Sequence, residues 1–133
     1  MKNIVKIKDL AKSRIEEFIE TKNPWYKWSK TYIEWIDDEW EEVQEEIKEN
    51  NSVYLEDELW DLFWDYMCLL NSLEKEWKIS SVDKVFERSY KKFSERISAV
   101  RESIPWQGWI WDKIKQKQKK ENKEEHDKLY INN

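Results

Sequence analysis

Two short acidic motifs on either side of a polar turn constrain the fold of this chain most strongly. Glu42 and Glu45 lie three residues apart, as do Glu58 and Asp61, and Asn50-Asn51-Ser52 falls within the twelve residues between the motifs. Positions three apart share one face of an α-helix, so each motif directs two carboxylates the same way. If the chain reverses at the turn, both motifs stand at a similar height on antiparallel helices. The sequence therefore predicts a helical hairpin on which four carboxylates converge.

Converging carboxylates need either water or a cation, because like charges at close range oppose each other's ionisation. Hard oxygen ligands without His or Cys suit Mg²⁺, or Mn²⁺ in its place, better than zinc or iron. A di-iron site of the ferritin type would use Glu-x-x-His, and the single histidine, His126, lies far away in a polar tail. The motifs favour a magnesium site, with solvated carboxylates as the alternative.

The rest of the sequence predicts an all-α bundle of four to five helices. The chain has one glycine and two prolines among 133 residues, and 40% of its residues are charged, which is typical of long helices with tight connections. Apolar spacing predicts helices over residues 8–22, 28–49, 53–77 and from Ser81 to Pro105. We expect residues 1–115 to form one domain and residues 116–133 to be a lysine-rich, flexible tail with a disordered end.

The third predicted helix has an apolar face bordered by acids. Glu58, Asp61 and Asp65 lie at spacings of three and four, along a stripe that adjoins this face. Acids beside an apolar stripe can reach a cavity between helices. The apolar face itself consists of Leu55, Leu59, Leu62, Tyr66 and Leu69.

Charge and cysteine content limit the classes of function. The net charge is −5, and residues 113–133 carry seven lysines against four acids, so the remainder of the chain is strongly acidic. An acidic body argues against a general nucleic-acid binder. The N-terminus lacks a signal-peptide pattern, and no apolar run approaches transmembrane length, so we expect a cytoplasmic protein that does not bind a membrane. Cys68 is alone, and its apolar helical context predicts a buried thiol.

Ten tryptophans exceed what one small bundle can bury. They predict an oligomer interface, an aromatic ligand pocket, or both. Trp25, Trp28, Tyr32 and Trp35 recur at helical spacing, which is typical of a core or dimer interface and also allows base stacking by one or two of them. A further group of three, Trp106, Trp109 and Trp111, surrounds Gln107-Gly108, where we expect flexibility.

Three cations follow at intervals of four on the fourth predicted helix: Arg88, Lys92 and Arg96. They either pair with acids on neighbouring helices or hold a polyphosphate.

Several segments, in order, resemble the MazG family of nucleotide pyrophosphohydrolases. The sequences EVQE and ELWD match the family signature, in which ExxE and a spacer precede ExxD. NPWYKWSKTYIEWIDDEWEEVQEEI resembles the segment that begins with Cys-Pro-Trp, and YKKFSER resembles Lys-Phe-x-x-Arg. The closing Trp-x-x-x-Lys element corresponds to Trp111-Asp-Lys-Ile-Lys115. Asn23 replaces the usual Cys, and Trp60 replaces a small residue within ExxD.

This resemblance implies Mg²⁺-dependent hydrolysis of a nucleoside triphosphate to the monophosphate and pyrophosphate, by a homodimer or a dimer of dimers. House-cleaning of non-canonical nucleotides is the expected role. Dimeric dUTPase-like, dCTPase-like or phosphoribosyl-ATP hydrolysis is an enzymatic alternative, and a catalytically silent helical dimer is an alternative of another class.

Particular residues carry these expectations. The expected metal ligands are Glu42, Glu45, Glu58 and Asp61. Lys92 and Arg96, with Arg88 as a weaker candidate, are expected to hold the polyphosphate. The proton acceptor is expected among Glu45, Glu41 and Glu46, and the base is expected to stack on Trp25, Trp28 or Trp111.

Overall fold

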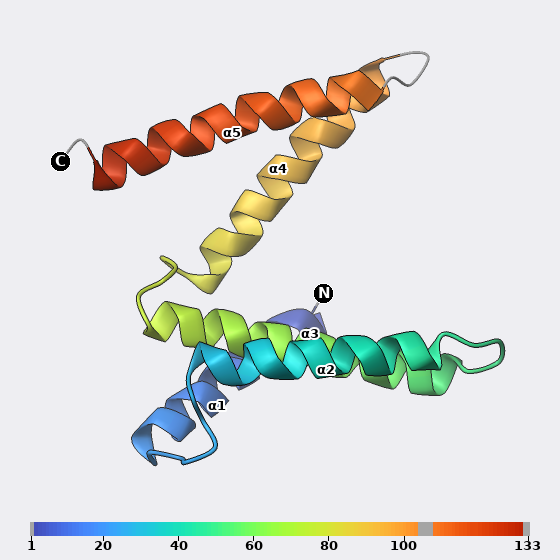
Figure 1. Ribbon diagram of the computed structural model, residues 1–133, viewed down its shortest axis with the longest axis vertical. Helices are drawn as coiled ribbons and strands as arrows, with labels where there is room; N and C mark the ends of the chain where they lie inside the picture. The colour runs from blue at the N-terminus through green and yellow to red at the C-terminus, as the bar shows by residue number, and fades with distance from the viewer. Residues whose placement is uncertain (1, 104–107, 132–133) are drawn as a thin grey trace. The chain divides into compact units, whose positions relative to one another are not determined.

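The computed structural model describes residues 2–103 and 108–131, and these residues form helices joined by turns (Figure 1). The all-α prediction is therefore confirmed for this part of the chain. Backbone contacts divide the chain into two compact units, Met1–Val82 (unit 1) and Asp83–Asn133 (unit 2). The helices are α1 (Lys2–Glu20), α2 (Ser29–Glu46), α3 (Ser52–Lys75), α4 (Val82–Glu102) and α5 (Gly108–Tyr130).

Unit 1 is organised around α3, which contacts both α1 and α2. Figure 1 shows α2 and α3 running side by side in opposite directions. The chain reverses between Glu46 and Ser52, as predicted, and the Asn51 side chain closes the turn by donating to the Glu46 carbonyl oxygen at 2.9 Å. The buried apolar residues of this unit are Ala11, Ile15, Tyr32, Val43, Met67, Cys68, Leu70 and Val82.

The buried face of α3 differs from the predicted one. Leu59 and Tyr66, which belong to the predicted apolar face, are 46% and 39% exposed. The face that packs inside unit 1 instead includes Asp65, Cys68 and Ser72, all of them buried. The correction has a physical reason: α3 is apolar around much of its circumference, so apolar spacing alone does not determine which side meets α1 and α2.

Two helices of unit 1 end in a Schellman motif without glycine. At the end of α1, Lys22 has a φ of 49°, and the backbone N–H of Asn23 donates to the Phe18 carbonyl oxygen at 3.0 Å. The end of α3 has the same arrangement, with Trp77 at a φ of 59°. A side chain with a Cβ atom is disfavoured in this left-handed conformation. Both positions therefore cost conformational energy that glycine would avoid.

Unit 2 consists of α4 and α5, which are joined by polar side chains. Arg88 donates to both carboxylate oxygens of Glu125, at 3.0 and 2.5 Å. The Gln118 amide donates to the Lys92 carbonyl oxygen at 3.1 Å, and its own oxygen accepts from Arg96 Nε at 2.8 Å. These contacts link the stretch of α4 from Arg88 to Arg96 with the stretch of α5 from Gln118 to Glu125.

The prediction of a disordered chain end is corrected by α5, which continues to Tyr130. Ion pairs four residues apart line this helix, as in Lys117–Glu121 and Lys120–Glu124. Such pairs each stabilise a helix by about 0.2–0.5 kcal/mol. The prediction of disorder rested on the lysine content of this segment. It did not consider that the acids follow the lysines at a spacing of four, which favours a helix.

Of the predicted flexible pair Gln107-Gly108, Gln107 lies outside the described residues and Gly108 begins α5. Among the residues that the structure describes, no helix combines the length and the apolar character needed to cross a membrane. The predicted buried thiol is confirmed at Cys68.

The left-handed position at the end of α1 gives a stability prediction. Substitution Lys22→Gly should raise the free energy of unfolding by about 0.5–1 kcal/mol, because glycine has no Cβ atom to clash in this conformation. The matched change Lys12→Gly, at an exposed position inside α1, should lower it by about 1 kcal/mol. Chemical denaturation monitored by circular dichroism measures the free energy of unfolding of both variants. A loss of stability in Lys22→Gly would contradict the left-handed conformation assigned to Lys22.

Candidate metal centre

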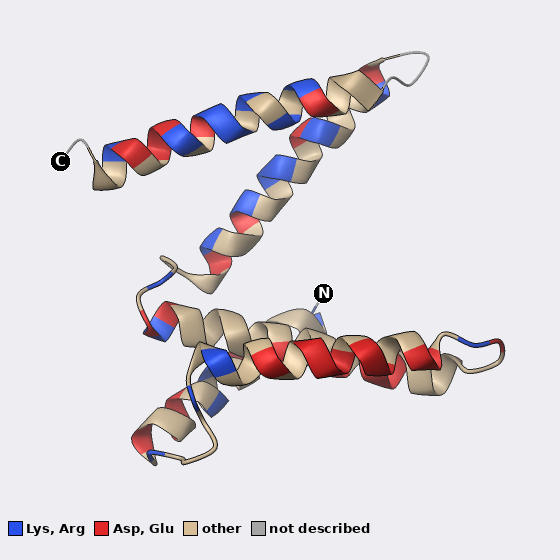
Figure 2. Ribbon diagram, in the orientation of Figure 1, with Lys and Arg blue, Asp and Glu red and all other residues tan. Residues whose placement is uncertain are grey.

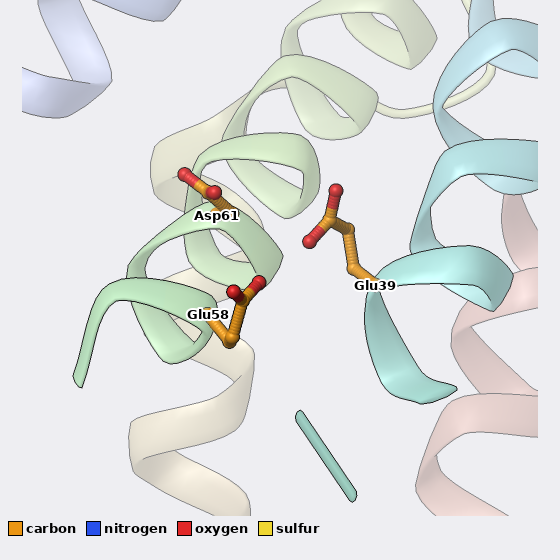
Figure 3. A group of neighbouring side chains, drawn as sticks. All are labelled: Glu39, Glu58 and Asp61. Atoms are coloured by element: carbon orange, nitrogen blue, oxygen red, sulfur yellow. The ribbon is translucent and has the colours of Figure 1, made fainter. Parts of the chain in front are cut away.

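Three carboxylates meet where α2 faces α3. Glu39 projects from α2, and Glu58 and Asp61 project from successive turns of α3 (Figure 3). One carboxylate oxygen from each residue lies within 4.8 Å of the other two. The second predicted motif, Glu58 and Asp61, therefore takes part in a convergent group of carboxylates. Its partner on α2, however, is a residue that the sequence analysis did not select as a ligand.

The acid of α2 that meets Glu58 and Asp61 is Glu39, which lies one helical turn before the predicted pair Glu42 and Glu45. Both Glu39-x-x-Glu42 and Glu42-x-x-Glu45 fit the pattern ExxE, and the structure brings Glu39, not Glu45, to the acids of α3. Burial on α2 explains this choice. Tyr32 and Val43 are buried at 2% and 4% exposure, and Glu39 lies seven residues after the first and four before the second, on the same face. Glu45 lies two residues after Val43, so it points away and is exposed.

Electrostatics at Glu39 reflect this crowding. Burial, followed by the charges of Glu42, Asp65, Asp61 and Glu58, raises the pKa of Glu39 to about 7. One of its oxygens, Oε2, is buried and has no hydrogen-bond partner among the described residues. The structure thus holds a carboxylate in a place where ionisation is disfavoured and no protein donor compensates.

The acids of α3 show the same effect. Burial, then the charges of Glu42 and Asp61, raises the pKa of Glu58. Burial, then the charge of Asp61, raises the pKa of Asp65 to about 6. Glu58 and Asp65 therefore resist ionisation in the metal-free protein.

This donor set fits a hard divalent cation. Every ligand atom is a carboxylate oxygen, which matches the preference of Mg²⁺ and Mn²⁺ over softer metals. A cation beside the unpartnered Oε2 of Glu39 would supply the interaction that no protein group provides. Figure 2 shows that acidic residues recur along α2, and no lysine or arginine adjoins Glu39 in the sequence of this helix.

The predicted proton acceptors lie at the edge of this group. Glu41 and Glu45 are exposed. Glu46 is half-buried and takes part in the turn between α2 and α3, where it accepts a hydrogen bond from Asn51 at 2.5 Å and pairs with Lys48 at 3.7 Å. The structure therefore gives Glu46 a role in the turn and leaves Glu41 and Glu45 facing solvent.

A row of polar residues on α3 continues from the acids toward the C-terminal end of the helix. Cys68 shares a hydrogen bond with the Tyr32 hydroxyl, and burial raises the pKa of this thiol to about 12. Farther along, the Tyr26 hydroxyl donates to Ser72 Oγ at 2.9 Å. At the end of the row, Glu76 accepts from the backbone N–H of Ser29 at 3.0 Å. We call these α3 residues, Glu58, Asp61, Asp65, Cys68, Ser72 and Glu76, the polar seam.

An aromatic pocket lies at the N-terminal end of α2. It has a volume of about 280 Å³ and is lined by Pro24, Trp25, Lys27, Thr31, Glu34 and Trp35. Trp25 is 77% exposed, and the Trp35 ring meets the Tyr32 ring edge to face at 5.5 Å between centroids. Two indole rings with a cation and a carboxylate nearby can accept a planar polar group.

The other predicted base-stacking residues have partners within the protein. Trp28 does not line this pocket; its ring lies 5.4 Å from that of Tyr26, and its backbone has φ 59° and ψ −145°, a region that glycine alone adopts readily. Trp111 in unit 2 lies under the Arg96 guanidinium, 5.3 Å from the ring centroid, and beside the Phe93 ring. Both rings are held in place by packing.

The three cations of α4 differ in their surroundings. Arg88 is ion-paired with Glu125, which raises the pKa of the guanidinium. Arg96 is 8% exposed and packs against aromatic rings. Lys92 is exposed, and its ammonium lies 5.1 Å from the Phe93 ring centroid. Of the two predicted roles, pairing with an acid on a neighbouring helix therefore applies to Arg88, whose partner Glu125 lies on α5 in the same unit.

Comparison with known protein families assigns the chain. The sequence model of the MazG nucleotide pyrophosphohydrolase domain matches residues 28–100, more than half of the chain. The chain belongs to the MazG family. The matched MazG region contains α2, α3 and most of α4, with Glu39, Glu42, Glu58, Asp61 and Asp65, whereas Trp25 and Trp111 lie outside it. No curated protein and no solved structure matches the chain significantly. MazG domains typically depend on a divalent metal, in agreement with the acidic group.

The sequence analysis missed Glu39 as a member of the group and gave Asp65 no role. The signal for Glu39 was its spacing from Tyr32 and Val43, the apolar residues of α2 that turn out to be buried. Asp65 carried a weaker signal, its place on the acidic stripe of α3. Its burial depends on tertiary packing that periodicity does not reveal.

The raised pKa of Glu39 gives a prediction for the metal-free protein. Between the ordinary pKa of 4.5 and the raised value of about 7, the folded protein binds more protons than the unfolded chain. Stability should therefore fall as the pH rises from about 5 to about 8. Melting temperatures measured in chelator across this range should show the decline. The decline should be weaker in Glu39→Gln and unchanged in Glu45→Gln, and equal slopes in all three proteins would contradict the crowding at Glu39.

Proposed function

We propose that this protein is a Mg²⁺-dependent nucleoside triphosphate pyrophosphohydrolase, which converts NTP or dNTP to the monophosphate and pyrophosphate. The observation that carries the proposal is the meeting of Glu39, Glu58 and Asp61 within a matched MazG domain. A solvated acidic surface would not require carboxylate oxygens from two helices to converge, nor a buried oxygen without a partner.

The proposed ligands are Glu39, Glu42, Glu58 and Asp61. Glu39 takes the place that the sequence analysis gave to Glu45, because Glu45 points away from α3. Glu42 is included because its charge acts on both Glu39 and Glu58. A bound Mg²⁺ would neutralise charge on the phosphate oxygens and favour attack of water on the α-phosphorus.

The aromatic pocket is the proposed site of the nucleoside. Thr31, Trp35 and Glu39 follow at intervals of four on α2, so the pocket and the carboxylates share one helix face. One turn of about 5.4 Å separates Trp35 from Glu39, which suits a nucleotide whose base lies in the pocket and whose phosphates lie at the carboxylates. Trp25 and Trp35 would stack on the base, and stacking tolerates any base.

Lys92 and Arg96 are the proposed contacts to the polyphosphate, following the family's Lys-Phe-x-x-Arg segment. Lys92 is exposed, and no acid among the described residues pairs with its ammonium, which lies over the Phe93 ring. Arg88 is a weaker candidate because phosphate binding would compete with its ion pair to Glu125. Trp28 and Trp111 remain secondary candidates for contacts to the nucleoside.

The proposed biological role is house-cleaning of non-canonical nucleotides in the cytoplasm, by a homodimer. Exposed apolar side chains on α2 and α3 support association: Trp40, Leu59 and Trp60 are 55%, 46% and 50% exposed. Monomeric proteins rarely leave so many large apolar groups in water. Trp60, which replaces a small residue within the second motif, would contribute to this surface.

A panel of canonical and modified nucleoside triphosphates tests the proposal. Pyrophosphate and the monophosphate should appear with Mg²⁺ and not with chelator. Turnover should fall on the order of 100-fold or more in Glu39→Gln, since loss of a group that orients a metal ligand already costs this much. The matched exposed variant Glu45→Gln should retain it. Release of orthophosphate would exclude attack at the α-phosphorus. No metal-dependent release of pyrophosphate from any nucleotide would favour a catalytically silent helical dimer.

A further inference from the structure

Asp65 is a buried carboxylate without a hydrogen-bond partner among the described residues. It is 4% exposed, and it lies on α3 one turn after Asp61. Its charge raises the pKa of Glu39 on α2, so Asp65 lies near the acidic group.

The polar seam shows that Asp65 is an exception. The seam residues that follow it toward the C-terminus are all bonded to groups of α2 or of the segment before it. Cys68 is bonded to the Tyr32 hydroxyl, Ser72 to the Tyr26 hydroxyl, and Glu76 to the Ser29 backbone and hydroxyl. Asp65 lies between these satisfied positions and the acids at Glu58 and Asp61, and the described part of α2 offers it no donor.

A buried, unpaired carboxylate is costly to a fold. Leaving a buried polar group without a partner costs about 1–3 kcal/mol, and more if the group is charged. The described residues supply the Asp65 carboxylate with no hydrogen-bond donor, so water or a ligand has to provide one. The unpartnered, buried Oε2 of Glu39 belongs to the same acidic group.

The total charge of the proposed ligands argues that Asp65 is not a further metal ligand. Four carboxylates already exceed the charge of one divalent cation, so a fifth would bind it with little further gain. Asp65 is also more buried than the others: it is 4% exposed, whereas Glu39 and Glu58 are half-buried and Glu42 and Asp61 are exposed. A water molecule held beneath the substrate phosphate fits this position, because it can donate to a carboxylate and at the same time face the phosphorus.

We propose that Asp65 is a further catalytic residue, which accepts a hydrogen bond from the attacking water and orients it toward the α-phosphorus. The inference rests on the proposed function. The water oxygen forms a bond to the α-phosphorus, and the bond from that phosphorus to the oxygen bridging to the β-phosphorus breaks. Pyrophosphate leaves with the bridging oxygen and its electron pair. The proton released by the water passes to the Asp65 carboxylate and then to solvent when the products leave.

The test compares Asp65→Asn with the wild type and with Asp37→Asn, a matched change at an exposed position on α2. In Asp65→Asn, kcat for the best nucleotide should fall by at least about 100-fold. KM should change little, and the rise in melting temperature on adding Mg²⁺ should persist. Asp37→Asn should behave as the wild type. The asparagine amide could itself disturb packing, so Asp65→Ser, which has a smaller side chain, is the second variant. Its kcat should fall by the same factor.

Several results would overturn the inference. If Asp65→Asn retains the wild-type kcat, the residue does not act on water. If the Mg²⁺-dependent rise in melting temperature disappears, Asp65 is a metal ligand instead. If KM rises and kcat is unchanged, it contributes to binding alone. If the wild type releases no pyrophosphate, the proposed function itself fails, and this outcome is distinguished from the others because it needs no variant.

Discussion

Repulsion among carboxylates at the contact between α2 and α3 is the constraint on which the account of this protein depends. Glu39, Glu58 and Asp61 bring oxygens within 4.8 Å of one another, and the pKa of Glu39 rises to about 7 as a result of burial and of its acidic neighbours. Packing of Tyr32 and Val43 holds the helices together in spite of this repulsion. The metal-free fold therefore stores an unfavourable interaction that a divalent cation would convert into a favourable one.

The polar seam shows how the same helix contact serves two purposes. Toward the C-terminal end of α3, hydrogen bonds from Tyr26, Tyr32 and Ser29 satisfy the seam and fix the two helices. Toward the N-terminal end, the seam consists of acids without protein partners in the described chain. The satisfied half supplies the rigidity that a ligand site requires, and the unsatisfied half supplies the affinity for a ligand.

Much of this could be predicted from the sequence, because local signals agreed with one another. Asn50 and Asn51 mark the reversal between the helices, and the 3-residue spacing of Glu58 and Asp61 directs both toward the same side. Segment resemblance was sufficient to identify the MazG family, which the family comparison confirms. These features depend on short stretches of chain, where spacing and turn residues determine the outcome.

The remaining features depend on packing. In a stretch as acidic as α2, ExxE occurs in overlapping registers, and only the burial of Tyr32 and Val43 selects Glu39 over Glu45. The buried side of α3 could not be identified because leucines and tyrosines occupy several of its faces. Besides its local ion pairs, α5 makes contacts such as Arg88–Glu125, which join residues distant in sequence and cannot be seen from periodicity. Asp65 illustrates the limit most clearly, since an acid on a helix is expected in water unless the tertiary structure is known.

The most direct measurement is a crystal structure of the protein grown with Mn²⁺, in which anomalous scattering locates the ion. The account predicts a peak between α2 and α3, coordinated by oxygens of Glu39, Glu42, Glu58 and Asp61, with Glu45 in solvent. A peak bound by Glu42 and Glu45 without Glu39 would contradict the assignment of the motif. The absence of any peak at saturating Mn²⁺ would contradict the claim that these carboxylates converge in order to hold a cation.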